Sequence, residues 1–203
     1  MKTQTQPHYS QPNTIADALA VQDFCVMENF FSPALVAALK LELLTTELSS
    51  AGIGRDGNTF ANADIRRDET RWLDDSSIVQ KELSAEMEAL RLVLNERLML
   101  GLFDYESHFA TYEPGAFYKR HTDSFKGKKN RILSTVLYLN EDWLEADGGL
   151  LKLYADNNTP EPFTTIIPTM GRFVLFLSET VPHEVTIANR TRSSIAGWFR
   201  CNE

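Results

Sequence analysis

The sequence lacks several features that mark common classes of protein. Its only cysteines are Cys25 and Cys201, and no spacing between them indicates a zinc site or a redox motif. We therefore expect two reduced thiols in a cytoplasmic protein. No apolar stretch approaches the roughly 18 uninterrupted residues of a membrane-spanning helix, and residues 1–20 contain none long enough for a signal peptide. The sequence thus predicts no membrane association.

Basic residues are outnumbered. The 203 residues include 28 Asp and Glu against 20 Lys and Arg, which gives a net charge of −8. A general nucleic-acid binder or a protein of anionic membranes needs a basic surface, so we exclude both classes. A hydrophobic content of 43% is enough for a core without disulfides. Nothing in the sequence requires a partner subunit, and we expect a monomer.

The N-terminal half has the pattern of helices joined by a long loop. Residues 1–14 are polar, which predicts an unordered tail ahead of a single domain spanning residues 15–203. The pair Ser32-Pro33 predicts a helix start, because Ser caps the first turn and Pro fits the first helical position. Leucines recur at four-residue spacing after this pair, and the helix is expected to end near Gly52.

A second helix is predicted to start at Ser77, where Ser77 and Gln80 have the spacing of a capping box. Its expected buried stripe consists of Val79, Leu83, Met87, Leu90, Leu94 and Leu98. Residues 52–72 are rich in glycine and charge without a helical period, so we expect a long surface loop or ribbon there. Helical support and loop together would occupy residues 15–105.

From Ser107 onward, short β-branched and aromatic runs alternate with turn residues. The eight runs are HFATYE, AFYKRH, ILSTVLYLN, LLKLY, FTTII, FVLFL, HEVTIA and SIAGWF. Eight short strands separated by Gly, Pro, Asn and Asp are typical of a double-sheet jelly roll. We predict an α+β, mainly β fold, in which a double-stranded β-helix (jelly roll) at residues 106–200 is covered by N-terminal supporting helices.

His121, Asp123 and His183 form a candidate metal site. Residues i and i+2 of a strand point to the same face, so His121 and Asp123, at the end of the second predicted strand, both aim into the barrel mouth. His183 opens the seventh strand, which neighbours the second in a jelly roll. Two His and one carboxylate are the ligands of a non-haem iron facial triad, which leaves coordination positions open. Mn(II) and Zn also suit these ligands.

Arg192, nine residues after His183, is a candidate anchor for an organic acid. We expect it to begin the last strand, next to the strand that His183 opens. A guanidinium buried in a barrel needs a carboxylate partner, and no acidic residue lies on the eighth strand. The distal carboxylate of a bound 2-oxoglutarate would be such a partner. Tyr138 on the third strand would add a hydroxyl to the same carboxylate.

Each of these residues has a simpler interpretation when it is taken alone. A His-x-Asp pair often arises by chance, His183 would be a structural histidine, and Arg192 would be an exposed ion-pairing residue. Their order and strand placement together favour the metal and co-substrate site. His108 has no partner in this pattern, and we interpret it as a packing or surface residue.

The segments around these residues resemble a known family. TYEPGAFYKRHTD, RILSTVLYLNEDW, DGGLLKLY and FLSETVPHEVTIANRTRSSIAGWF are similar to Fe(II)- and 2-oxoglutarate-dependent prolyl 4-hydroxylases, in particular bacterial relatives of the hypoxia-inducible-factor prolyl hydroxylases. The resemblance covers roughly residues 23–200. Collagen-type enzymes have Lys where this chain has Arg192, and nucleic-acid demethylases place their Arg further along. The resemblance implies a dioxygenase that uses Fe(II), 2-oxoglutarate and O2, with ascorbate as a stimulant.

The resemblance also implies residue roles. His121, Asp123 and His183 would bind the iron. Arg192 and Tyr138 would hold the distal carboxylate of 2-oxoglutarate, in a pocket that is also lined by Tyr112 and Tyr118. Residues 64–72 (DIRRDETRW) are similar to a finger loop that folds over the substrate. In that loop Asp68 would pair with Arg131. Three residues would lie beside the target proline: Arg66, Trp72 and Trp198.

The implied reaction is hydroxylation of C4 of a prolyl residue in a protein, and elongation factor Tu is the leading substrate. Two alternatives stay open: an oxygenase of the same fold that acts on a small molecule or another protein side chain, and a non-catalytic metal-binding sensor module. Whether such an enzyme serves oxygen sensing also stays open. Residues 126–131 form a basic turn, which is either a solvated lysine-rich turn or a positive rim that steers an acidic partner.

Overall fold

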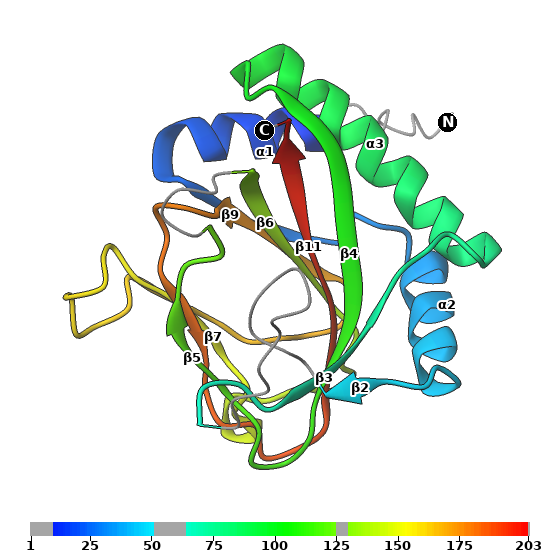
Figure 1. The fold of residues 1–203 in the computed structure, drawn as a ribbon, viewed down its shortest axis with the longest axis vertical. Helices are drawn as coiled ribbons and strands as arrows, with labels where there is room; N and C mark the ends of the chain where they lie inside the picture. Colours follow the sequence, from blue (N-terminus) through cyan, green and yellow to red (C-terminus); the bar gives the residue numbers. More distant parts are fainter. Residues whose placement is uncertain (1–9, 51–63, 125–129, 203) are drawn as a thin grey trace, which may run out of the picture.

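The computed structural model describes residues 10–50, 64–124 and 130–202. Within these ranges, helices cover one face of a seven-stranded antiparallel sheet, and a four-stranded antiparallel sheet lies against its other face (Figure 1). No helix in these ranges is both long and apolar enough to cross a bilayer. The architecture is the mainly β jelly roll with supporting helices that the sequence predicts.

The helices begin where the sequence offers caps. Their bounds are α1 Ser10–Gln22, α2 Pro33–Leu44 and α3 Ile78–Leu98, with a short 3-10 helix η1 at Glu145–Asp147. Ser32 accepts a hydrogen bond from the N–H of Leu35 at 3.1 Å, and Ser77 accepts one from the N–H of Gln80 at 3.0 Å. Both serines are the predicted N-caps. The α3 stripe is buried at Leu83, Met87, Leu90 and Leu94.

The seven-stranded sheet has the order β1-β9-β6-β11-β4-β3-β2. Its strands are β1 Phe24–Glu28, β2 Ser49–Ser50, β3 Asp68–Trp72, β4 Leu102–Tyr112, β6 Arg131–Tyr138, β9 Arg172–Leu177 and β11 Arg192–Cys201. β11 is central and pairs with β4 and β6. Its side chains alternate, so Ile195 and Phe199 pack under the helices, whereas Arg192, Ser194 and Trp198 face the smaller sheet.

The four-stranded sheet has the order β5-β10-β7-β8. Its strands are β5 Tyr118–His121, β7 Leu151–Leu153, β8 Thr164–Ile166 and β10 His183–Val185. In the β5–β10 pair, His121 lies directly opposite His183. All eight predicted strands are therefore present, and the second and seventh are neighbours as expected.

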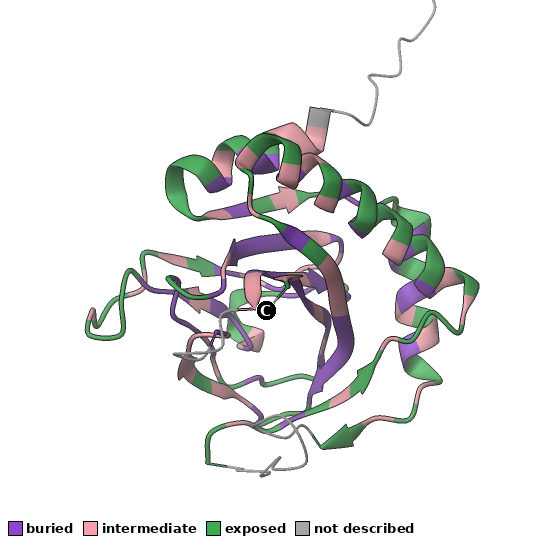
Figure 2. Cartoon of the chain, turned by 45° about the horizontal axis from the view of Figure 1, so that its top comes forward, coloured by how far each residue is buried: buried purple, intermediate pink, exposed green. Residues whose placement is uncertain are grey.

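Two apolar layers hold the sheets in place, and buried residues follow the strands that enclose the interior (Figure 2). The larger layer lies between the helices and the large sheet and includes Leu39, Met87 and Phe199. A smaller layer between the two sheets includes Leu153 and Val174. Burial of apolar surface stabilises the folded state by roughly 25 cal/mol per Å². Both layers therefore stabilise the packing of the two sheets.

Several predicted boundaries are wrong. Residues 10–14 belong to α1, so the predicted tail is too long, and residues 1–9 lie outside the described ranges. α2 ends at Leu44 instead of near Gly52. The reason is local, because the hydroxyls of Thr45 and Thr46 donate to the Glu42 carbonyl oxygen and compete with helical hydrogen bonding.

The segment 52–72, predicted as a loop or ribbon, has a strand at its end. Its last five residues form β3 at the side of the large sheet, paired with β4, and residues 51–63 lie outside the described ranges. Arg192 is also placed differently from the prediction. β11 belongs to the large sheet and β10 to the small one, so Arg192 faces the strand of His183 across the space between the sheets.

Candidate metal and co-substrate site

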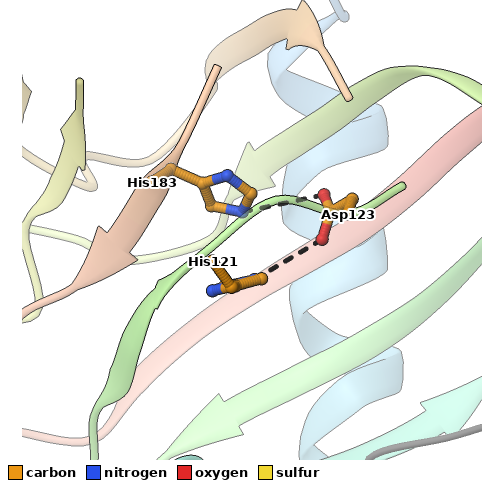
Figure 3. A group of neighbouring side chains, drawn as sticks. All are labelled: His121, Asp123 and His183. Carbon is orange, nitrogen blue, oxygen red and sulfur yellow. Dashed lines mark ion pairs between the residues drawn. The ribbon is translucent and has the colours of Figure 1, made fainter. Parts of the chain in front are cut away.

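Three metal-binding side chains meet at the β5–β10 end of the small sheet (Figure 3). The Asp123 carboxylate lies between the two rings, with Oδ1 3.5 Å from Nε2 of His121 and Oδ2 3.6 Å from Nε2 of His183. One ligand atom from each residue lies within 4.8 Å of the others. The three groups are close enough to hold a single ion, as the sequence motif predicts.

Backbone carbonyl groups fix the ring orientations of both histidines. Nδ1 of His121 is 2.7 Å from the Lys119 oxygen, and Nδ1 of His183 is 3.2 Å from the Val181 oxygen. A carbonyl oxygen only accepts, so each Nδ1 carries the proton and each Nε2 keeps a free lone pair. Burial lowers the pKa of His183 to about 4, which keeps this ring in the neutral form that binds metals.

The Asp123 carboxylate is held by donors from two strands. Ser134 on β6 donates to Oδ2 at 2.6 Å, and the Trp198 indole on β11 donates to the same oxygen at 2.9 Å. Burial opposes ionisation of Asp123, but His183, His121 and the Ser134 hydrogen bond outweigh it and hold its pKa well below the usual range. Two imidazoles and one ionised carboxylate suit a divalent iron and leave open positions.

Arg192 is the most conspicuous charge in the interior, because its side chain is fully buried without a carboxylate partner in the described residues. Its Nε donates to the Gly149 oxygen at 2.8 Å and its Nη1 to Ser194 Oγ at 3.3 Å. A Cβ at Gly149 would lie 2.8 Å from Arg192 Cδ, and Gly149 has a φ of +60°. Glycine is therefore required there for the guanidinium to fit.

The Tyr138 hydroxyl is buried beside Arg192 and has no hydrogen-bond partner in the described part of the chain. The Arg192 guanidinium carbon lies 5.0 Å from the centre of the Tyr138 ring. Burial raises the pKa of Tyr138 against the opposing charge of Arg192, so the hydroxyl stays protonated and can donate. An unpaired cation next to an unused donor fits a carboxylate such as the distal one of 2-oxoglutarate.

One pocket of about 90 Å³ joins the two groups of residues, since His121, Asp123, His183 and Arg192 all line it. Two predicted tyrosines line it as well. Tyr112 lies opposite Arg192 in the β4–β11 register. The Tyr118 ring stacks on His121 with 3.6 Å between centroids, and burial raises its pKa to about 12. Tyr112 thus stands at the Arg192 end, and Tyr118 supports a metal ligand.

The predicted ion pair between Asp68 and Arg131 is wrong. Asp68 instead binds Arg66 through two hydrogen bonds, of which Nη2–Oδ2 is 2.8 Å. Arg131 binds Glu106 Oε1 at 2.8 Å and lies 3.6 Å above the Trp198 ring. The cause is local, because residues two apart on an extended segment share a face. Arg66, two residues before β3, is therefore close enough to pair with Asp68.

The remaining predicted residues divide by position. Arg66, Arg131 and Trp198 line the pocket. Trp72 is 50% exposed, with its ring 6.2 Å from that of Trp198. Trp72 therefore stands at the rim instead of inside. The lysines of the basic turn, Lys126, Lys128 and Lys129, lie outside the described residues.

Ser134 and His108 are two of the pocket residues that the sequence did not predict. Ser134 donates a hydrogen bond to Asp123, and a signal for it existed, because it has the same strand phase as Tyr138. His108 lines the pocket and is 3% exposed, so it is not a surface residue. A signal for it existed, since His108 has the same strand phase as Ala110 and Tyr112.

Comparison with known proteins agrees with this geometry. Residues 107–200 match the 2OG-Fe(II) oxygenase superfamily. A prolyl-4-hydroxylase from Pseudomonas putida is 38% identical, with a TM-score of 0.84 over 94% of this chain and 99% of that one. A prolyl hydroxylase from Trichoplax adhaerens, solved with a hypoxia-inducible-factor oxygen degradation domain peptide, is 27% identical with a TM-score of 0.83 over 98% and 94% of the two chains.

A longer relative matches only in part. The prolyl 3,4-dihydroxylase OGFOD1 of Ostreococcus tauri is 34% identical over 106 residues, which make up 45% of this chain. The chain spans only 20% of that protein's length. The similarity to that relative is thus confined to one region of it, whereas the similarity to the bacterial structure extends over nearly the whole of both chains.

Proposed function

Because this chain belongs to the 2OG-Fe(II) oxygenase superfamily, in its prolyl hydroxylase branch, we propose that it hydroxylates C4 of a prolyl residue in a protein, with release of succinate and CO2. The proposal is carried by one spatial relationship. A His, Asp and His cluster shares a pocket with a buried, unpaired Arg192 beside an unused Tyr138 hydroxyl. Such a pocket fits Fe(II) at one end and the carboxylate of 2-oxoglutarate at the other.

The residues of the chain position and shield the reactants. His121 and His183 present Nε2 lone pairs, and Asp123 is oriented by hydrogen bonds from Ser134 and Trp198. When bound, iron and 2-oxoglutarate supply the oxidising chemistry with O2. Arg192 and Tyr138 would orient the co-substrate through its distal carboxylate. The buried residues that line the pocket would limit the access of water to the reacting groups.

The proposal also specifies the class of substrate. The Pseudomonas putida relative is a prolyl-4-hydroxylase, and the Trichoplax adhaerens prolyl hydroxylase was solved with a peptide fragment of the hypoxia-inducible factor. These relationships support a prolyl residue in an exposed segment of a protein. Elongation factor Tu is our leading substrate. We further propose a monomer that acts in the cytoplasm and whose turnover ascorbate stimulates.

The test is anaerobic reconstitution with Fe(II) and 2-oxoglutarate, followed by O2 and mass spectrometry of elongation factor Tu and of a fractionated bacterial extract. We expect one added oxygen atom on a proline, together with succinate. His183→Ala should abolish both, whereas Arg190→Gln, which removes an exposed guanidinium paired with Asp147, should retain both. Hydroxylation of another side chain or of a small molecule would favour the alternative oxygenase. A lack of succinate with every fraction would exclude the enzyme.

A further inference from the structure

His108 is a buried polar side chain whose hydrogen-bonding capacity is unused. It is 3% exposed, and neither ring nitrogen has a hydrogen-bond partner in residues 10–50, 64–124 and 130–202. Buried polar atoms in folded proteins nearly always have a partner, because an unsatisfied one loses its hydration without compensation. His108 lines the same pocket as the metal-binding residues, so a molecule in that pocket can be the missing partner.

The strand register places His108 at the end of the pocket opposite the co-substrate anchor. The pocket face of β4 carries, in order, Tyr112, Ala110 and His108. On β11 they lie opposite Arg192, Ser194 and Ala196, in that order. Four residues of strand separate the Arg192 position from the His108 position, which is about 13 Å at the usual rise. A 2-oxoglutarate held by Arg192 would therefore leave the His108 end to another molecule.

The His108 ring lies between two tryptophan side chains of the pocket. The His108 ring lies 5.0 Å from the Trp72 ring and 5.3 Å from the Trp198 ring, measured between centroids. Trp72 is half exposed at the rim, and Trp198 also binds the metal ligand Asp123. His108 thus lies between the mouth of the pocket and the candidate metal-binding residues. It is not part of the cluster of potential metal ligands among the described residues.

We propose that His108 is a substrate-binding residue that hydrogen-bonds the peptide backbone next to the target proline, with the two tryptophans packing on that segment. The inference rests on the proposed prolyl hydroxylase function and specifies how the substrate is held. A proline nitrogen has no hydrogen to donate, so the backbone groups available to His108 are those of the neighbouring residues and the proline carbonyl.

The protonation state of His108 matches such a partner. Burial, reinforced by Arg66, lowers its pKa to about 3, so the ring is neutral at physiological pH. A neutral imidazole has one donor and one acceptor. These complement the C=O and N–H of a peptide, whereas a substrate group of fixed charge would meet no opposite charge on His108.

The experiment uses short peptides with one central proline and otherwise randomised sequence. The wild-type enzyme with Fe(II), 2-oxoglutarate and O2 selects the peptide that gains oxygen. Binding of this peptide is then measured by calorimetry on enzyme loaded with Mn(II) and N-oxalylglycine, an inert analogue of 2-oxoglutarate. We compare wild type with His108→Phe, which keeps a ring without nitrogens, and His108→Gln, which restores one donor and one acceptor.

We expect His108→Phe to weaken peptide binding about tenfold or more, the effect of losing a buried hydrogen bond, and His108→Gln to recover part of the loss. The KM for 2-oxoglutarate and the affinity for Mn(II) should not change. Ser107→Ala is the matched control, since Ser107 is the neighbouring buried residue on the opposite face of β4 and should bind peptide like wild type. In NMR spectra of protein labelled with 15N at histidine, the His108 ring signals are those that are missing from His108→Phe. Addition of the peptide to wild type should shift these signals.

Failure of the His108 inference can be distinguished from failure of the proposed function. If wild type hydroxylates peptides and His108→Phe binds them equally well, His108 is only a packing residue and the inference is overturned. If wild type binds 2-oxoglutarate but oxidises no peptide or protein, the proposed function falls, and this inference falls with it. Loss of Mn(II) binding in His108→Phe would also contradict the inference, because it would place His108 in the metal site.

Discussion

The indole Nε1 of Trp198 lies 2.9 Å from Oδ2 of Asp123 and donates to it. This contact connects the wall of the substrate pocket to a metal ligand. Ser134 donates to the same oxygen at 2.6 Å, while Oδ1 faces His121. The carboxylate is therefore oriented by its neighbours before any ion binds, and Arg131 extends this support from above the Trp198 ring.

Trp198→Phe should lower metal affinity about tenfold, because loss of a hydrogen bond to a metal ligand typically lowers affinity 10- to 100-fold. Calorimetric titration of the metal-free protein with Mn(II) measures the change. Trp143→Phe is the matched control, since the Trp143 indole donates to the Gly148 oxygen away from the metal ligands. Equal losses in both variants would show that the effect is structural and that the indole does not orient Asp123.

Tyr138→Phe should raise the KM for 2-oxoglutarate about tenfold, the usual effect of one lost hydrogen bond, without lowering the free energy of unfolding. The reason is that the Tyr138 hydroxyl has no partner to lose in the described residues of the free protein. Arg192→Gln should raise the KM further, roughly 100-fold, since it removes the charge that pairs with the carboxylate. Steady-state succinate assays and urea denaturation test both variants. A destabilised Tyr138→Phe with an unchanged KM would refute the assignment.

The corrected ion pairs can be tested by double-mutant cycles on unfolding free energy. Asp68→Asn and Arg66→Gln should be coupled by about 1–3 kcal/mol, as expected for contacting charged groups, because both side chains are largely buried. Asp68→Asn and Arg131→Gln should be additive within about 0.5 kcal/mol, because Arg131 pairs with Glu106. Strong coupling between Asp68 and Arg131 would instead support the ion pair that the family resemblance implies.

The sequence predicts the metal site well because two of its ligands are near neighbours and the third follows from the jelly roll. His121 ends β5 and Asp123 follows two residues later. His183 opens the strand that pairs with β5, as the strand order of a jelly roll predicts. Helix starts at Ser32 and Ser77 are equally local, since each cap bonds within its own first turn. Features that depend on one residue and its near neighbours can be predicted without knowledge of the fold.

Features that depend on contacts between distant segments could not be predicted in this way. The position of β11 in the large sheet determines that Arg192 faces the metal ligands from the opposite wall, and the order of strands along the chain does not reveal it. Residues 10–14 gain their helical form from packing of α1, where Ile15 and Leu19 are buried in the shared core. Strand phase alone could have placed His108 on the pocket face, but the lack of hydrogen-bond partners for its ring is known only from the fold.

Acid sensitivity of folding should depend on His108. Burial lowers its pKa from 6.5 to about 3 in the folded protein, so below about pH 6.5 the unfolded chain binds a proton that the folded protein does not. The free energy of unfolding then falls by up to about 1.4 kcal/mol per pH unit as the pH drops from about 6.5 toward about 3. The full contribution of neutral His108 to stability is therefore present only above about pH 6.5. His108→Phe should therefore gain about 2 kcal/mol relative to wild type between pH 8 and pH 5.

Urea denaturation of metal-free wild type and His108→Phe at the two pH values measures this difference. Metal-free protein is required because proton-driven release of an ion from His121 and His183 would add its own pH dependence. Those histidines are present in both proteins, so their titration cancels in the comparison. Parallel pH profiles would mean that His108 is hydrated in the folded state, in which case it would have no unmet hydrogen bonds to offer a substrate.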